Sequence, residues 1–284
     1  MLTRAMFDTI FRAYTAVPSL SGSEDALFEE VYRRFNAAAN RPADTQWSIE
    51  YKAGHIYYGL FQMQPWKPIL DKKRIVYVVH LDRVPNYQNG EPYAQNGAIE
   101  GDNYRGQLDN SVSLAILEGL VASGIPMNIL FTTWEERGRS WPQLVDMQNK
   151  WPDTKLVTMD IDIFQKSDGE SLQHITLRTE DEDDTFDQDL VAFLRATAHE
   201  QGIPYTIVIG SAIVETGRMS KNTGGAMKGA HIGLPLLNYH SNQELMHWNV
   251  IRDAAQLVMA IQGKITQSPR SKTKTTKSTT TATI

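Results

Sequence analysis

The sequence has 284 residues, a formal net charge of -5 and a hydrophobic fraction of 41%. This length suits one large domain or two small ones with a substantial core. The mildly acidic balance gives no broad attraction to nucleic acid or to an anionic membrane surface. The chain has no cysteine, so disulfides and thiolate metal sites are excluded, and any metal would need His, Asp and Glu as ligands.

The first residues do not resemble a secretion signal, because Asp8 interrupts the apolar stretch and no small-residue cleavage site follows. They fit an amphipathic helix with Leu2, Met6, Ile10 and Phe11 on its inner face. No run approaches the roughly 18 apolar residues that a membrane helix needs. We therefore expect a cytoplasmic protein, with export by a route that uses no such signal as the alternative.

The hydrophobic pattern predicts helices and strands that alternate along the chain. The first helix covers residues 1–16, and a second is capped by Ser21 or Ser23, with Leu27, Val31 and Phe35 on one face. The remaining elements, in chain order, are strands 46–50, 55–62 and 74–80, helix 111–123, strands 127–132 and 156–160, helix 187–201, strand 205–209, helix 226–230, strand 234–239 and helix 249–261. This alternation predicts an α/β domain with a largely parallel sheet.

Two polar segments interrupt this pattern. The acidic run EDEDD (180–184) is expected to be a solvated loop, with a weak cation site as the alternative. The Thr/Lys-rich end has no acidic residue and little to bury, so we expect a disordered tail over 264–284. Such a basic tail is expected to be solvated, and contact with nucleic acid or an acidic partner is the alternative.

Acidic residues and histidines follow the ends of several predicted strands. In an open α/β sheet, ligands bind beyond the carboxyl ends of the strands, so residues that follow a strand are the first candidates. Five segments supply such groups: His80 with Asp82, Asp109 before the helix at 111–123, Glu135 with Glu136, Asp160 with Asp162, and His240. These side chains are good ligands for a borderline divalent metal.

Each of these residues also has an ordinary explanation when it is taken singly. A histidine after a strand is often a hydrogen-bonded core residue, and Asp109 could be only a helix cap. The adjacent Glu135 and Glu136 repel each other and resist burial. Two divalent ions about 3.5–4 Å apart would offset that repulsion. One glutamate could then bind metal while its neighbour acts as general base toward a bridging water.

The order of these residues resembles that of the co-catalytic zinc exopeptidases, which include di-zinc aminopeptidases and related carboxypeptidases, deacylases and amidases. The shared order is H-x-D, a lone aspartate before a helix, E-E-x-G, an aspartate at a strand end and a late histidine. The matching stretches are AVPSLSGSED (16–25), HLDRVP (80–85), GQLDNSVSLAIL (106–117), TTWEERG (132–138), TMDID (158–162) and YHSNQE (239–244). H-x-D alone is unspecific, but the five elements in this order are fairly specific.

The resemblance implies two divalent metal ions, with Zn2+ as the expected metal. The implied ligands are His80 and Asp160 on one ion, Glu136 and His240 on the other, and Asp109 bridging both. Asp82 would orient His80. Glu135 would take a proton from the bridging water and later deliver it to the leaving amine. Asp162 is close enough to Asp160 that either could be the ligand.

The resemblance also implies a three-layer α/β/α sandwich with a mostly parallel central sheet. Many relatives carry a second domain, either between H-x-D and the bridging aspartate or before the last histidine. Here the first of these spans is expected to be a short loop, and the second is only about 80 residues long. We therefore expect a catalytic domain over residues 1–263 with no inserted lid domain.

The leading functional hypothesis is a di-zinc aminopeptidase that acts on peptides. The alternatives are an N-acyl amino acid deacylase or amidase of the same fold, and a non-catalytic scaffold. The polar, Gly-rich segment 216–226 is expected to be a loop, and Arg218, Asn222 and Thr223 are its candidates for substrate binding. A homo-oligomer is a further hypothesis, because a cleft with no inserted domain could be shaped by a second subunit.

Overall fold

A computed structural model describes residues 2–39, 45–63, 74–84, 97–163, 173–180, 186–209, 214–241 and 243–266. Its α-helices are α1 (Arg4–Thr15), α2 (Asp25–Ala38), α3 (Ser111–Ala122), α4 (Trp141–Lys150), α5 (Gln188–Glu200), α6 (Glu215–Asn222) and α7 (Trp248–Thr266). Its strands are β1 (Thr45–Lys52), β2 (His55–Met63), β3 (Arg74–His80), β4 (Ala98–Glu100), β5 (Asn103–Gly106), β6 (Asn128–Thr132), β7 (Thr154–Ile163), β8 (Ile175–Glu180), β9 (Tyr205–Ile209), β10 (Ala230–Leu236) and β11 (Glu244–His247). A short 3-10 helix, η2 (Glu135–Arg137), follows β6.

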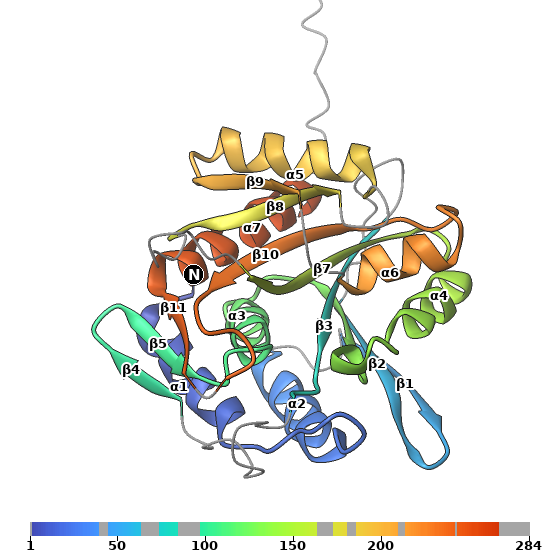
Figure 1. The fold of residues 1–284 in the computed structure, drawn as a ribbon, viewed down its shortest axis with the longest axis horizontal. Coiled ribbons are helices and arrows are strands. Elements are labelled where there is room, and N and C mark those ends of the chain that lie inside the picture. Colours follow the sequence, from blue (N-terminus) through green and yellow to red (C-terminus); the bar gives the residue numbers. More distant parts are fainter. Residues whose placement is uncertain are drawn as a thin grey trace, which may run out of the picture.

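The larger sheet has eight strands in the order β1-β2-β6-β3-β7-β10-β8-β9 (Figure 1). Its centre, β6-β3-β7-β10, is parallel, as the buried β-branched run of β3 predicts. The pairs β1–β2, β2–β6 and β10–β8 are antiparallel and lie on either side of this centre. The expected α/β fold is confirmed, and the sheet is mixed with most of its pairings parallel.

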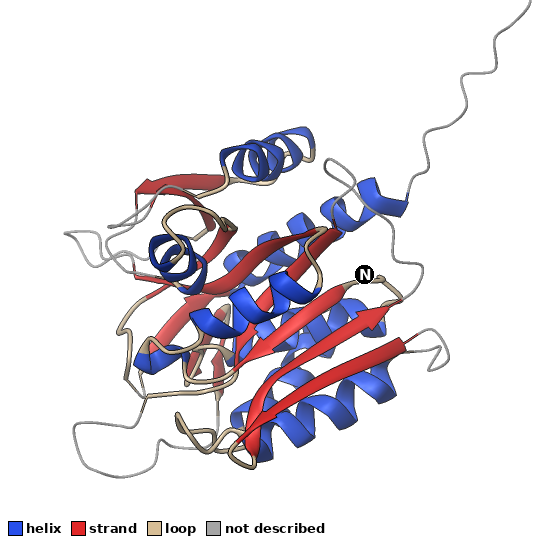
Figure 2. Ribbon diagram, turned by 90° about the vertical axis from the view of Figure 1, so that its right-hand side faces the viewer, coloured by secondary structure: helices blue, strands red, loops and turns tan. Residues whose placement is uncertain are grey.

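Helices cover both faces of the eight-stranded sheet (Figure 2). One face packs against α1, α2, α3, α5 and α7 in the main core, and the other packs against α4 and α6 in a smaller core. Alternate residues of β3 divide between them, so that Tyr77 and Val79 face the main core while Val76 and Val78 face the smaller one. This burial on both faces explains why β3 is apolar almost throughout.

A second sheet of three strands, β11-β5-β4, lies beside the larger one. The prediction of a short loop between Asp82 and Asp109 is therefore wrong, because β4 and β5 form an antiparallel hairpin there and β5 pairs with the distant β11. Strands of three or four residues are too short to show a clear alternation in the sequence. Residues 85–96 of the same span lie outside the described residues.

The segment predicted to be a Gly-rich loop, 216–226, is largely the helix α6. Polar and small side chains of α6, including Glu215, Thr216 and Ser220, are buried, so its inner face does not look apolar in the sequence. The short helix predicted at 226–230 is also wrong, because these residues lead into β10. The helix α4 and the strand β8 were not predicted.

The N-terminal helices form where predicted, but the buried face of α1 includes Phe7 and Tyr14 beside the predicted Ile10 and Phe11, while Leu2 and Met6 are only partly buried. The apolar face of α2 is buried at Leu27, Val31 and Phe35 as expected. Ser21 and Ser23 do not cap this helix, whose N-cap residue is Glu24. The hydroxyl of Ser21 instead donates to the carboxylate of Asp82 at 2.6 Å.

The final helix, α7, runs to Thr266, beyond the expected end of the domain at residue 263. The rest of the predicted tail, residues 267–284, lies outside the described residues, as does the acidic run after Glu180. None of the helices in the described part of the chain combines the length and apolar character needed to span a bilayer.

Candidate active site

The candidate ligands gather at one edge of the larger sheet, within or just beyond the carboxyl-terminal parts of its central strands. They come from five segments: the end of β3 (His80), the segment before α3 (Asp109), η2 after β6 (Glu135 and Glu136), the C-terminal part of β7 (Asp160) and the turn after β10 (His240). The parallel strands explain this gathering, because their carboxyl ends lie at the same edge.

One group consists of His80, Asp109 and Asp160, whose ligand atoms all lie within 4.8 Å of one another. Nε2 of His80 is 2.9 Å from Oδ1 of Asp109 and 3.2 Å from Oδ1 of Asp160. Asn110 donates to the Asp160 carboxylate at 3.1 Å and to the carbonyl of Met159 at 2.8 Å. These bonds fasten the segment that carries Asp109 to β7.

A second group consists of Asp109, Glu136 and His240, again with ligand atoms within 4.8 Å of one another. Nε2 of His240 is 3.0 Å from Oε2 of Glu136 and 3.8 Å from Oδ2 of Asp109. Asp109 thus presents Oδ1 to the first group and Oδ2 to the second. The ring of Tyr239 stacks on His240, with ring centroids 3.6 Å apart.

The buried carboxylate of Asp82 holds the backbone of the glutamate pair. Its Oδ1 accepts from the N–H of Glu135 at 2.9 Å, and its Oδ2 accepts from the N–H of Glu136 at 3.0 Å. Nδ1 of His80 lies 3.0 Å from the Asp82 carbonyl oxygen and 3.5 Å from Oδ1. Burial opposes ionisation, but His80, Ser21 and the backbone donors keep the pKa of Asp82 below its usual value.

The carboxyl groups of Asp109, Glu135 and Glu136 are difficult to ionise, because they are buried close to one another. Burial, followed by the charge of Asp109, raises the pKa of Glu136 to about 11. Burial likewise raises the pKa of Glu135 and Asp109 above their usual values. Burial alone would lower the pKa of His80, but the nearby Asp160 and Asp109 carboxylates raise it well above its usual value. A cation between these carboxyl groups would favour their ionised forms and lower their pKa.

The polar atoms of the two groups fit divalent metal ions. Oδ1 of Asp109, Oε1 of Glu136 and Nε2 of His240 are buried and make no hydrogen bond of normal geometry in the described structure. Each is a lone-pair donor of a type that Zn2+ accepts. Each group offers three protein ligands when Asp109 is counted in both, which leaves a coordination position for water or substrate.

Glu135 has surroundings different from those of Glu136. Its side chain is 10% exposed, and Oε1 lies 3.8 Å from Nη1 of Arg218 on α6. The same guanidinium nitrogen donates to the Glu135 carbonyl oxygen at 3.3 Å. Glu135 is in neither of the two three-residue groups. This position leaves its carboxylate available for proton transfer.

Three other predicted candidates lie apart from the two groups. Asn222 and Thr223 are at the C-terminal end of α6 and hydrogen-bond to backbone carbonyls of that helix. The carboxylate of Asp162 accepts a hydrogen bond from the Thr176 hydroxyl and forms an ion pair with the buried Arg178, both on β8. Asp160 is therefore the aspartate of β7 that lies beside His80.

Two buried glutamates near the site were not predicted. Glu215, at the start of α6, accepts a hydrogen bond from the Thr132 hydroxyl at 2.7 Å, and burial raises its pKa to about 7. Glu244 accepts from the backbone of Asp109 and of His240. The only signal for Glu244 was its place in YHSNQE, and Glu215 had none because it lay outside every predicted element and every matching stretch.

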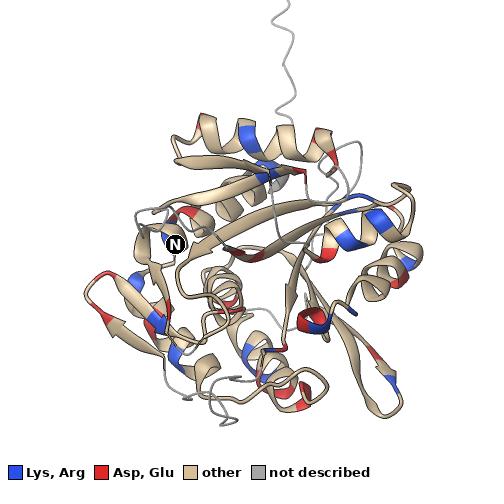
Figure 3. Ribbon diagram, viewed as in Figure 1, with Lys and Arg blue, Asp and Glu red and all other residues tan. Residues whose placement is uncertain are grey.

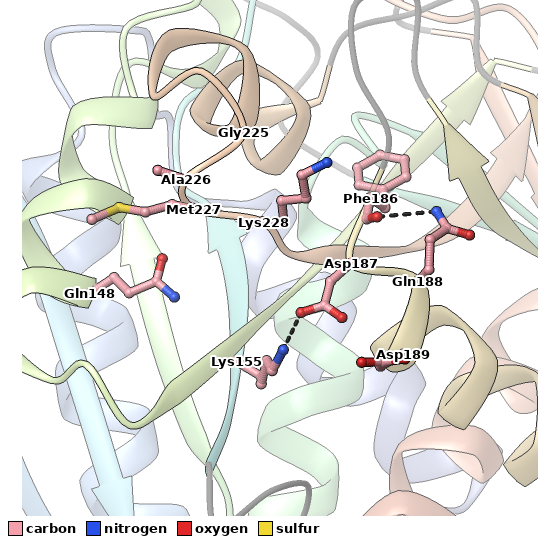
Figure 4. A pocket seen from close by; sticks show the side chains of 10 residues that line it. All are labelled: Gln148, Lys155, Phe186, Asp187, Gln188, Asp189, Gly225, Ala226, Met227 and Lys228. Carbon is pink, nitrogen blue, oxygen red and sulfur yellow. Dashed lines mark hydrogen bonds and ion pairs between the residues drawn. The ribbon is translucent and has the colours of Figure 1, made fainter.

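A cavity of about 380 Å³, drawn in Figure 4, is lined by none of the residues of these groups. It is lined by Lys155 near the start of β7 and by Asp187, with which that lysine pairs. Asp160 lies about 17 Å further along the same strand. Among the described residues, both signs of charge are interspersed along the helices and strands (Figure 3).

A model of the M42 glutamyl aminopeptidase family matches residues 102–257, more than half of the chain. The matched region contains Asp109, Glu135, Glu136, Asp160 and His240, whereas His80 and Asp82 precede it. A search of curated protein sequences found no significant match.

Solved aminopeptidases have a similar fold. An aminopeptidase from the archaeon Desulfurococcus kamchatkensis is 12% identical, with a TM-score of 0.68 over 94% of this chain and 99% of that chain. The TET1 peptidase of Pyrococcus horikoshii is 13% identical, with a TM-score of 0.66 over 90% and 99%. The aminopeptidase PepT of Bacillus cereus is 11% identical, with a TM-score of 0.67 over 94% and 100%. The chain therefore belongs to the M42 glutamyl aminopeptidase family and is a metal-dependent aminopeptidase, a hydrolase of peptide bonds.

Proposed function

We propose that this aminopeptidase uses two divalent metal ions, one held by His80, Asp109 and Asp160 and the other by Asp109, Glu136 and His240. The observation that carries the proposal is the pair of three-residue groups that share Asp109. Zn2+ is the proposed metal, because imidazole and carboxylate ligands suit it. The proposed catalytic domain is the predicted span 1–263, extended to the end of α7 at Thr266.

The metal ions, when bound, would lower the pKa of the attacking water and polarise the scissile carbonyl. We assign the proton transfer to Glu135, which directly precedes Glu136 in the sequence and belongs to neither group. Its carboxylate would accept a proton from the attacking water and return it to the departing amine. Asp82 holds the backbone of Glu135 and Glu136, so it would fix the base relative to the ligand beside it.

Arg218 is the proposed substrate-facing residue of α6. It is 27% exposed at the side chain and lies beside Glu135, where a peptide substrate would have to approach the base. Its guanidinium could donate to a substrate carbonyl or carboxylate. The family assignment favours peptide substrates over the N-acyl amino acids considered as an alternative.

We also propose that the chain forms a homo-oligomer. The TET1 peptidase of Pyrococcus horikoshii is described as assembling into a tetrahedron or a large octahedral shell, and a related structure as a dodecamer. Light scattering coupled to gel filtration should give a mass that is a multiple of 32.0 kDa. A mass of one chain at micromolar concentration contradicts this proposal.

The decisive experiment counts bound metal in protein purified without chelators. We expect close to two zinc ions per chain in the wild type and a loss of both ions from Asp109→Ala, because Asp109 serves both groups. Hydrolysis of aminoacyl chromogenic substrates should be lost with the metal. One tightly bound ion in the wild type, or two ions in Asp109→Ala, would contradict the shared-ligand site.

A further inference from the structure

The buried side chain of Glu244 lies between two segments that carry members of the second group. Glu244 is the first residue of β11, is 3% exposed, and stands opposite Gly106 of β5 in the small sheet. This pairing places it beside the chain that leaves β5 toward Asp109. In the sequence it follows His240 by four residues. It is therefore close to both segments at once.

Both oxygens of Glu244 accept hydrogen bonds from the main chain. Oε2 accepts from the N–H of Leu108 at 2.7 Å and from the N–H of Asp109 at 3.2 Å. Oε1 accepts from the N–H of His240 at 3.0 Å. The carboxylate thus joins two stretches of backbone that are about 130 residues apart in the sequence.

The backbone at His240 needs such support. His240 has φ +56° and Asn238 has φ +58°, so two non-glycine residues of this turn adopt the left-handed conformation. Non-glycine residues keep this conformation only where their surroundings hold them. The hydrogen bond from the His240 N–H to Glu244 stabilises this conformation. It also fixes the position of the Cα atom from which the imidazole side chain extends.

The first group depends less on this carboxylate. His80 and Asp160 lie on β3 and β7, which are paired neighbours in the central sheet. The Asp109 segment is also fastened to β7 through the side chain of Asn110. A change at Glu244 should therefore displace His240 from Asp109 while the arrangement of the first group is largely kept.

We propose that Glu244 is a positioning residue for the second metal ion, because its carboxylate sets the separation of Asp109 and His240 through their backbones. The inference rests on the proposed two-metal site. It assigns Glu244 no contact with substrate or with metal. The predicted consequence of losing this carboxylate is a selective loss of affinity for one of the two ions.

The test is a calorimetric titration of the metal-free full chain with Zn2+. The bound ions are also counted after dialysis. Glu244→Gln keeps the shape but replaces one acceptor oxygen by an NH2 group, which would face a backbone N–H. We expect one ion to bind Glu244→Gln with wild-type affinity and the other to bind about 10- to 100-fold more weakly, the range for residues that orient metal ligands. Peptidase activity should recover as Zn2+ is raised above the weakened dissociation constant.

Two further variants separate positioning from general damage to the fold. Glu244→Asp keeps the charge but is one methylene shorter, so it cannot reach both segments, and we expect the same selective loss. Glu118→Gln is the matched control, because Glu118 is a buried glutamate that accepts from Tyr14 at 2.5 Å and from Arg34 at 2.8 Å, on the α3 face toward α1 and α2. Glu118→Gln should bind both ions as the wild type does.

The outcomes distinguish this inference from the function on which it rests. If the wild type binds only one ion, both the two-metal site and the role of Glu244 are wrong. If the wild type binds two ions and folded Glu244→Gln or Glu244→Asp binds both with unchanged affinity, the inference alone is wrong. Equal weakening of both ions also overturns it, because the effect would then not be specific to the second group.

Discussion

Glu135 and Glu136 are neighbours in the sequence, but their side chains face different partners. Glu136 lies against His240 and Asp109, whereas Glu135 lies near Arg218. The backbone makes this separation possible, because Trp134 has φ +65° and η2 begins directly after it. Asp82 then binds both N–H groups of the pair. A carboxylate that holds the backbone thus lets two adjacent glutamate side chains meet different partners.

At the residue scale, Glu135→Gln should lower kcat by about 10²- to 10⁴-fold, the usual contribution of a general base. Its metal content should stay at the wild-type value, because Glu135 is in neither group of ligand atoms. The measurement is kcat on an aminoacyl chromogenic substrate together with a metal count on the same sample. Glu29→Gln, at an exposed position of α2, is the control and should leave both unchanged. Wild-type turnover by Glu135→Gln would rule out its role as base.

At the scale of the elements, a glycine in β10 allows side chains of β7 and β8 to contact each other. β10 lies between these two strands in the sheet, and Gly233 is paired in register with Asp160 of β7 and with Thr176 of β8. Because Gly233 has no side chain, Asp162 can reach across to Thr176 and Arg178. Asp162 is thus paired with Arg178, while Asp160, two residues earlier, lies beside His80.

Gly233→Ala should therefore lower the free energy of unfolding by about 1–3 kcal/mol, the usual cost of overpacking a core. An added Cβ would overlap both the Thr176 hydroxyl and the Asp162 carboxylate. The measurement is the urea midpoint at constant m-value. Gly263→Ala in α7 is the control, because its Cβ would meet no atom within 4 Å, and it should stabilise the helix by up to about 1 kcal/mol. A neutral Gly233→Ala would show that β10 is not tightly packed at this position.

At the scale of the whole molecule, several buried carboxyl groups resist ionisation around one edge of the sheet. Burial raises the pKa of Glu215 to about 7, and burial together with Asp109 raises that of Glu244 to about 8. The pKa of both groups in the unfolded chain is near 4.5. Between about pH 4.5 and pH 8, the folded metal-free chain therefore binds more protons than the unfolded chain. Its stability therefore decreases as the pH rises through this window.

In excess chelator, we expect the free energy of unfolding to fall from pH 6 to pH 8.5, with a slope on the order of 1 kcal/mol per pH unit. Added Zn2+ should raise the melting temperature and flatten this fall, because it binds the ionised carboxylates of the folded chain. The measurement is chemical denaturation at several pH values with and without metal. A metal-free chain that gains stability between pH 6 and pH 8.5 would contradict this account.

The sequence by itself determined the α/β class, the central strands and the order of the candidate ligands. Runs such as Arg74–His80 are apolar because both of their faces are buried, and that property is local enough to be seen without a structure. The ligand candidates could be found because parallel strands bring their carboxyl ends together.

Only the tertiary structure decided which of these residues meet. The choice between Asp160 and Asp162 depends on the space that Gly233 leaves two strands away, and the small sheet depends on pairing between β5 and β11. The link that Glu244 makes between Asp109 and His240 and the bond between Ser21 and Asp82 are contacts over long sequence separations. Such contacts leave no periodic pattern in the chain, because each joins single residues that the fold alone brings together.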